Sequence, residues 1–102
     1  MEKAKVFVTI TGLNHYYGSM PFAEGQIVEC KKEPKNPYDP EAIKVMVDGF
    51  GIVGHIANST STRKGETLSA GAVGMLTKKK FKVKIVGVDE FFAIAKVVKG
   101  LK

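Results

Sequence analysis

The sequence predicts a mainly β fold, a small antiparallel barrel of six strands with one or two short helices. Apolar and polar residues alternate in six short segments, separated by turns rich in glycine, asparagine, aspartate and proline. No helical stretch of ten or more residues lies between successive strands, which excludes a parallel sheet built from βαβ units. The chain has 102 residues, enough for one modest core, so we expect a single domain over 1–102.

The first half of the chain contains four of the predicted strands. Alternation predicts strands over 6–10 and 26–33, and the aperiodic segment 14–24 between them is expected to be a loop. A third strand over 43–47 follows a proline-rich turn. Asp48-Gly49 is a hairpin signal, and Phe50-Gly51 completes the loop before a fourth strand over 52–56.

The second half contains a polar loop, a helix and two strands. Residues 57–65 are small and polar and are the best candidate for a mobile loop, whose hydroxyls, Arg63 and Lys64 could contact phosphate. Cap-like residues at 67–69 precede a short helix over 70–76, which Gly71 and Gly74 weaken. Strands are predicted over 80–85, with three lysines on one face, and over 92–98, before a tail over 99–102.

Composition and motifs exclude several classes of protein. No apolar run reaches the roughly 18 residues of a membrane span, and the first five residues are too polar for a signal peptide, so we expect a cytoplasmic protein. Cys30 is the sole cysteine and alternates with Val28, which predicts a buried structural thiol without a disulfide. The histidines give no zinc spacing and no catalytic motif is present, so neither a metal, a cofactor nor enzyme activity is expected.

The charge of the chain is unevenly distributed. The net charge is +6, but residues 1–50 carry six basic and seven acidic side chains, whereas residues 51–102 carry ten basic and three acidic ones. Half of those ten lie in the run 78–84. An uneven basic surface is typical of proteins that bind polyanions, although a solvated lysine face also keeps small proteins soluble.

The most informative segment is 36–45, where a turn bracketed by prolines leads into the third predicted strand. Asn36-Pro37 opens a turn and Pro40 closes it, because proline fixes its own φ and keeps the preceding residue out of the helical region. Tyr38 and Asp39 therefore sit side by side on a stiff loop. The tyrosine could pack on the barrel while the aspartate bonds its own backbone, or both could face a ligand.

Three motifs follow one another along the chain: Gly12-Leu13 with Tyr16-Tyr17-Gly18, then Glu33-Pro34 with Asn36-Pro37-Tyr38-Asp39 and Ala42-Ile43-Lys44-Val45, then Val53-Gly54-His55-Ile56. In this order and spacing they resemble the motifs of the HIRAN domain family, in its stand-alone bacterial form. The resemblance covers about residues 8–88 and is densest over 33–56. It implies a small barrel of the OB type that binds DNA, notably free 3′ ends of single strands.

The resemblance also implies roles for particular residues. Tyr38 and one tyrosine of the 15–17 loop, Tyr16 before Tyr17, would hold the terminal base between them. Asp39 would accept from the terminal hydroxyl, because a carboxylate suits a hydroxyl and repels a phosphate. The predicted DNA-binding residues are His15, Tyr16, Tyr17, Asn36, Tyr38, Asp39, Lys44, His55, Lys80, Lys82 and Lys84.

Two departures from the family pattern remove positive charge near this pocket. Asn14-His15 stands where a cation usually precedes the tyrosine pair, and Ala57-Asn58-Ser59 stands where lysines often follow the Gly-His-Ile motif. Lysines elsewhere could replace that charge. The expected partners are single-stranded DNA or DNA ends, with proteins of DNA repair or replication as further possibilities. The alternative is a protein- or small-ligand-binding module that uses the same pocket, or an accessory subunit that pairs through a barrel edge.

Overall fold

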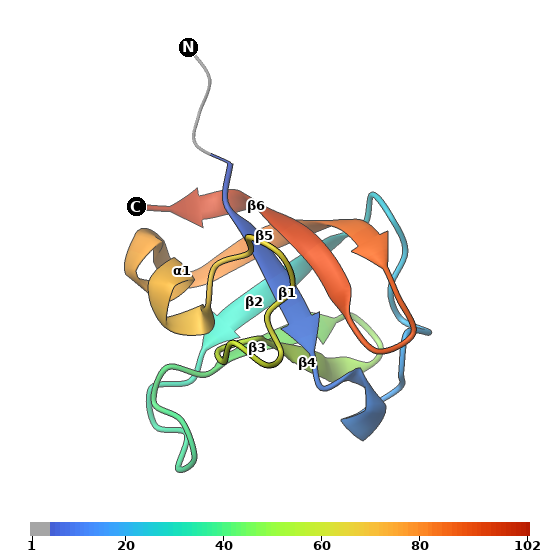
Figure 1. The fold of residues 1–102 in the computed structure, drawn as a ribbon, viewed down its shortest axis with the longest axis horizontal. Coiled ribbons are helices and arrows are strands. Elements are labelled where there is room, and N and C mark those ends of the chain that lie inside the picture. The colour runs from blue at the N-terminus through green and yellow to red at the C-terminus, as the bar shows by residue number, and fades with distance from the viewer. Residues whose placement is uncertain (1–4) are drawn as a thin grey trace.

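Six antiparallel strands close into a barrel in the computed structural model, which describes residues 5–102 (Figure 1). The strand order around the barrel is β1-β4-β3-β2-β5-β6, with β6 pairing back to β1. The predicted mainly β fold with short helices is therefore confirmed. The elements are β1 Phe7–Thr11, the 3-10 helix η1 Leu13–His15, β2 Ile27–Lys32, β3 Ile43–Val47, β4 Gly51–Ile56, α1 Ala70–Leu76, β5 Thr77–Val88 and β6 Ala93–Leu101.

The inner faces of the strands form one apolar core, as the alternation predicts. Val8, Ile10, Val45 and Val83 are fully buried there because successive side chains of a strand point to opposite faces. Cys30 also points inward and is 1% exposed. Burial, with a smaller contribution from the charge of the neighbouring Glu29, raises the pKa of its thiol well above the ordinary range.

The middle of strand β1 is buried on both faces, although the sequence predicts one buried face. The outward-facing Thr9 is fully buried, and its hydroxyl lies 2.7 Å from the hydroxyl of Thr67. Ala57 N–H donates to the Thr9 carbonyl at 2.8 Å, and Lys64 N–H donates to the Thr9 hydroxyl at 3.0 Å. The segment 57–65, predicted as a mobile loop, is thus hydrogen-bonded to β1 near both of its ends.

The last two strands are longer than predicted. β5 begins at Thr77, directly after α1, and Thr77 pairs with Leu101, so the predicted tail over 99–102 is mostly strand. Gly100 permits this pairing, because its φ is +100° and an added Cβ would lie 2.5 Å from Phe81 Cβ. The 3-10 helix η1 lies in the segment predicted as loop, since three residues are too few to show a helical period.

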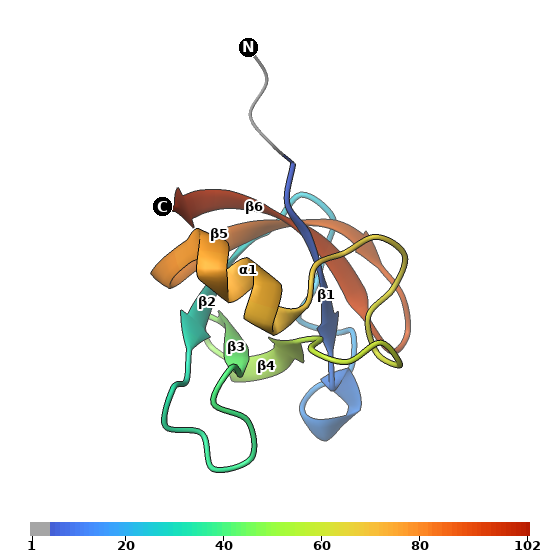
Figure 2. The same ribbon diagram turned by 60° about the vertical axis from the view of Figure 1, so that its left-hand side comes forward.

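Helix α1 packs against β5 on the outside of the barrel, and one face of the helix contributes to the core (Figure 2). Ser69 caps it by accepting from Ala72 N–H at 3.2 Å, and Ala70 and Val73 join the barrel core. Lys32 Nζ donates to the carbonyls of Gly74 and Thr77 at the other end, 2.6 Å from each. No helix within residues 5–102 is long and apolar enough to cross a membrane.

Candidate nucleic-acid interface

Two loops project from the same end of the barrel. One is the η1 part of the connection from β1 to β2, and the other is the turn over residues 33–42 between β2 and β3 (Figures 1 and 2). The rest of the β1–β2 connection runs along the barrel to its opposite end, where β2 begins. The end of β4 that carries His55 pairs with both neighbouring strands, since His55 lies opposite Thr11 on β1 and opposite Lys44 on β3. The predicted loops are therefore brought to one end of the molecule, with His55 between their strands.

The 33–42 turn is held by backbone and side-chain hydrogen bonds. Glu33 N–H donates to the Ala42 carbonyl at 2.8 Å, and Ala42 N–H donates to the Asp39 carbonyl at 3.0 Å. Asn36 Oδ1 accepts from the N–H groups of Tyr38 and Asp39, at 2.9 and 3.1 Å. Such an asparagine turn fixes the backbone locally. Asn36 therefore positions Tyr38 and Asp39 without having to touch a ligand itself.

Tyr38 stands at the tip of this turn and is 95% exposed. The interpretation in which its ring packs on the barrel is thus wrong. Within residues 5–102 it forms no ring pair with Tyr16 or Tyr17. Both faces of the Tyr38 ring are open to solvent on a backbone that is already ordered, which is the arrangement a stacking platform needs.

Asp39 does bond its own turn, as one of the two interpretations requires. Its Oδ1 accepts from Glu41 N–H at 2.9 Å, and its Oδ2 accepts from Asn58 Nδ2 at 3.0 Å. Asn58 Nδ2 also donates to Glu41 Oε1 at 3.2 Å, and Asn58 Oδ1 accepts from Gly71 N–H at the start of α1. A carboxylate has about four acceptor positions, so these two bonds leave capacity for a hydroxyl donor.

His55 connects the two loops. Its Nε2 lies 3.2 Å from Glu33 Oε1 at the base of the turn, and its ring centroid lies 6.1 Å from that of Tyr16. His55 and Glu33 side chains are 30% and 24% exposed. The structure therefore brings Tyr16, His55 and the 33–42 turn together at one partly exposed position.

The other two residues of the 15–17 loop, Tyr17 and His15, do not share the contact that Tyr16 makes with His55. Tyr17 makes an edge-to-face contact with Phe50 of the β3–β4 hairpin, with ring centroids 5.0 Å apart. His15 is the last residue of η1 and is exposed. Of the two tyrosines, Tyr16 is therefore the one that lies beside His55.

Gly54 explains why the Gly-His pair lies where it does. A Cβ on Gly54 would lie 2.9 Å from the Thr11 carbonyl oxygen, 3.0 Å from Ile10 Cγ2 and 3.1 Å from Leu13 Cδ2. Only glycine lets β4 approach β1 and η1 this closely. This close approach holds the neighbouring His55 beside the loop that carries Tyr16.

A row of lysines crosses the barrel away from His55. Lys44 lies opposite His55, Lys31 lies opposite Lys44, and Lys80 lies opposite Lys31. We call Lys44, Lys31 and Lys80 the lysine row. Neighbouring strands are about 4.8 Å apart, so the row ends roughly 14 Å from His55. The sequence-based prediction did not include Lys31. The alternation along β2 places Lys31 on the outer face, but only the strand pairing shows that it lies between Lys44 and Lys80.

The remaining predicted lysines lie outside this row. Lys82 is opposite Glu29 and Lys99, and Lys84 is opposite Ile27 and Lys96. Like charges directly opposite one another destabilise a sheet, and the barrel has such pairs at Lys31–Lys44, Lys31–Lys80, Lys82–Lys99 and Lys84–Lys96. Among residues 5–102 the ion pair present is His55–Glu33, so no carboxylate within ion-pairing distance neutralises these lysines.

Two further residues, Glu33 and Asn58, belong to the site. Glu33 stands in a motif quoted from the sequence. Asn58 was noted only as a departure from the family pattern, because its partners in the turn and in α1 are far away along the chain. No group of three or more histidine, cysteine or acidic side chains within the described part of the chain is arranged to hold a metal ion.

Comparison with known proteins gives a consistent result. The family model described as HIRAN domain matches residues 3–86. The crystal structure of the HIRAN domain of human HLTF is similar, with a TM-score of 0.67, 22% sequence identity, and coverage of 97% of this chain and 77% of that one. At this identity the likeness supports the fold alone. No curated protein matches the chain in sequence.

Proposed function

The chain belongs to the HIRAN domain family, a family of DNA-binding modules, and on that basis we propose that it binds single-stranded DNA and favours free 3′-hydroxyl ends. In this proposal Tyr38 and Tyr16 stack on the terminal base, and Asp39 accepts from the terminal hydroxyl. Asn36 holds the turn that carries Tyr38 and Asp39, and His55 faces the last phosphate. His15 and Tyr17, on the same loop as Tyr16, contact the strand further from its end.

The observation that carries the proposal is the exposure of Tyr38 on an ordered turn. The Tyr38 side chain is 95% exposed. Burying a side chain of this size against a ligand would be favourable by about 1.5–3 kcal/mol. The turn is already ordered by Asn36 and Asp39, so stacking a base on Tyr38 costs little additional chain entropy.

The lysine row supplies charge that the two departures from the family pattern remove. Lys44, Lys31 and Lys80 lead away from His55 across adjacent strands. At the 3.4 Å spacing of stacked nucleotides, the roughly 14 Å of this row corresponds to about four nucleotides. A strand held at its end by Tyr38 can thus lay its backbone along lysines that have no carboxylate within ion-pairing distance among residues 5–102. Lys82 and Lys84, on the adjacent rows, extend the same positive surface.

The end preference is tested by fluorescence anisotropy with one sequence as a 3′-hydroxyl strand, a 3′-phosphate strand and a closed circle. We expect the 3′-hydroxyl strand to bind most tightly. Asp39→Asn should abolish that preference and leave binding of the circle nearly unchanged, because a carboxylate adds nothing to backbone attraction. Glu41→Gln is the matched control, since it removes the other carboxylate on Asn58 and should keep the preference. An Asp39→Asn protein that folds and still prefers 3′-hydroxyl ends contradicts the role of Asp39.

The HIRAN domain is a binding module rather than a catalyst by itself, and we propose no enzyme activity and no cofactor for this chain. We further propose a cytoplasmic location and partners in DNA repair or replication. Absence of DNA binding at low salt would favour the alternative, a module that binds a protein or small ligand in the same pocket.

A further inference from the structure

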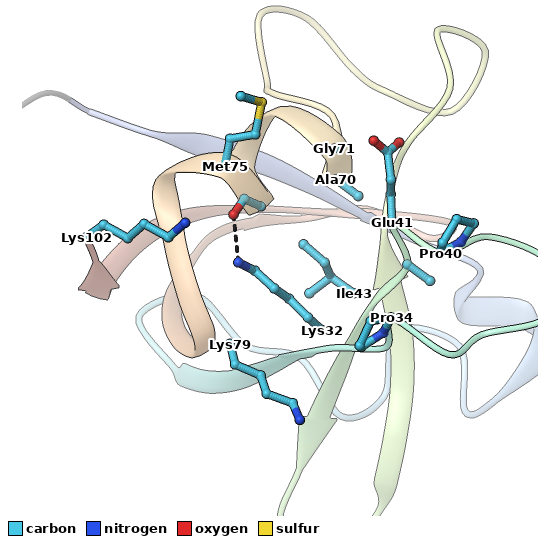
Figure 3. Close-up of a pocket in the computed structure, with 12 residues that line it drawn as sticks. Lys32, Pro34, Pro40, Glu41, Ile43, Ala70, Gly71, Met75, Lys79 and Lys102 are labelled. Carbon is cyan, nitrogen blue, oxygen red and sulfur yellow. Dashed lines mark hydrogen bonds between the residues drawn. The ribbon is translucent and has the colours of Figure 1, made fainter.

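A cavity of about 360 Å³ lies between α1 and the β2–β3 region, behind the 33–42 turn (Figure 3). Its volume is in the range of small-molecule pockets. Pro34, Pro40 and Glu41 of the turn form one wall, and α1 forms the opposite wall. Tyr38, Asp39, Tyr16 and His55 do not line it, so the cavity is separate from the proposed DNA pocket.

One part of the cavity is apolar. Ile43 and Ala70 are buried residues that line it, and the two prolines add rigid apolar surface. Met75 stands at its edge on α1 and is 77% exposed. Methionine side chains adapt to differently shaped ligands. An occupant therefore needs a short apolar body.

Another part of the cavity is cationic. Lys32, Lys79 and Lys102 line it together. Lys32 Nζ donates to the Gly74 and Thr77 carbonyls, which leaves one of its three N–H groups free. Burial, and secondarily the charge of Lys102, lower the pKa of Lys32. The Lys32 and Lys102 ammonium groups therefore repel one another, and an anion bound between them would offset this repulsion.

The one acidic side chain of the lining does not neutralise these lysines. Glu41 Oε1 accepts from Asn58 Nδ2 at 3.2 Å, and its carboxylate lies over Gly71, where a Cβ would come within 2.7 Å of it. Figure 3 shows the Glu41 carboxylate directed away from Lys32, Lys79 and Lys102. Within residues 5–102 none of the three lysines has a carboxylate within ion-pairing distance.

We propose that this cavity is a second binding site, for a small amphipathic anion with one carboxylate or phosphate-monoester head and a short apolar body. Figure 3 shows the Lys32 and Lys102 side chains extending toward one another, whereas the Lys79 ammonium group points away from both. The head therefore lies between the Lys32 and Lys102 ammonium groups, where charge-assisted hydrogen bonds are strong, and the body lies on Ile43, Ala70 and the prolines. This site goes beyond DNA binding, because none of the residues assigned to the strand end takes part in it.

The test is an amide-resolved NMR titration of the full chain with four probes. Octanoate and octyl phosphate carry both features, octylamine has the same apolar body with the opposite charge, and acetate has the head alone. We expect saturable shifts at Pro34-flanking amides and along α1 with one or both of the first two probes, and at least tenfold weaker binding of the other two. Equal binding of octylamine, or no saturable binding of octanoate and octyl phosphate, overturns the proposal; whichever of the two binds identifies the head.

Matched variants locate the site. A Cβ on Gly74 would lie 3.8 Å from Lys32 Cε and 3.9 Å from Ile43 Cδ1, so Gly74→Leu is directed into the cavity and should abolish binding. Lys102→Gln should weaken binding about tenfold, the loss of roughly one charge-assisted hydrogen bond. Lys78→Gln changes the net charge equally but removes a lysine outside the lining, and should bind as wild type. Equal loss in the Lys78 and Lys102 variants overturns the site.

The same titration separates this site from the DNA pocket. Tyr38→Ala should leave octanoate or octyl phosphate binding unchanged, whatever it does to DNA. A short single strand that displaces the bound probe would place the cavity within the nucleic-acid site and overturn its independence.

Discussion

Tyr38 and Asp39 are neighbours in the chain but are held in opposite ways. The Tyr38 side chain is 95% exposed, whereas the Asp39 carboxylate accepts from the Glu41 N–H and from Asn58. A change at Asp39 therefore affects the turn and its contact with α1 as well as any bound hydroxyl. A change at Tyr38 affects only what binds, which makes it the cleaner test of the pocket.

Tyr38→Ala should weaken single-strand binding by about 1–3 kcal/mol, or roughly 5- to 150-fold, the usual value of one base–aromatic stack. The thermal midpoint should stay at the wild-type value, because so exposed a ring contributes little to folding. Anisotropy and differential scanning fluorimetry measure the two quantities on the same samples. Wild-type affinity in the variant would exclude Tyr38 from the site.

Cys30 provides a residue-level test of the core. It is 1% exposed and burial raises the pKa of its thiol, so the native chain keeps its proton where an unfolded chain would release it. The free energy of unfolding should therefore fall as pH rises above about 8.5, the ordinary thiol value. Cys30→Ser should flatten that pH dependence in urea melts. Iodoacetamide should label Cys30 only as fast as the chain unfolds, and rapid labelling of the native protein would contradict its burial.

At the scale of elements, the contact of β4 with β1 and η1 positions the site. Gly54 allows the close approach, and His55 next to it reaches both Glu33 and Tyr16. Gly54 thus lets the strands pack closely, and the His55 ring makes the contacts with the two loops. This division explains how a short Gly-His pair joins two loops that are distant in the chain.

Gly54→Ala should destabilise the fold by about 1–3 kcal/mol, because its Cβ would meet the Thr11 carbonyl oxygen at 2.9 Å. Chemical denaturation measures the loss. Gly87→Ala is the matched control on a strand, since no atom lies within 4 Å of its Cβ, and it should remain within about 0.5 kcal/mol of wild type. Equal stability of the two variants would show that β4 can move away from β1 without cost.

At the scale of the whole molecule, the closed barrel brings lysines from both halves of the sequence together. The excess of basic residues lies after residue 50 in the sequence, yet Lys31 and Lys44 from the first half lie beside Lys80 from the second. The positive surface is thus assembled from both halves. Mutual repulsion of the opposed lysines is a cost that a bound phosphate backbone would relieve.

This surface predicts a salt dependence. If the three lysines of the row each neutralise one phosphate, log K should fall with log salt concentration at a slope of about −2 for a single strand. Lys31→Gln should reduce the slope by about 0.7 and weaken every strand equally, without changing end preference. Anisotropy at several salt concentrations measures both slopes. A flat dependence would favour a protein or small-molecule ligand instead.

Much of the fold was determined by the sequence alone. Alternation predicted six strands and the placement of Cys30 and Val8 inside the barrel, because the side-chain period of a strand is a local property. The 36–40 turn was likewise predictable, since proline and asparagine act on their own backbone. The family motifs added the barrel type and directed attention to Tyr38, Asp39 and His55.

Only the tertiary structure decided which of these residues lie together. Asn58 joins Asp39 to α1, Glu33 joins His55 to the turn, and Lys31 lies between Lys44 and Lys80. Each contact depends on strand order and register around a closed barrel, which the pattern within one strand does not contain. The same holds for the burial of Thr9 and the length of β5 and β6, which follow from what packs or pairs alongside them.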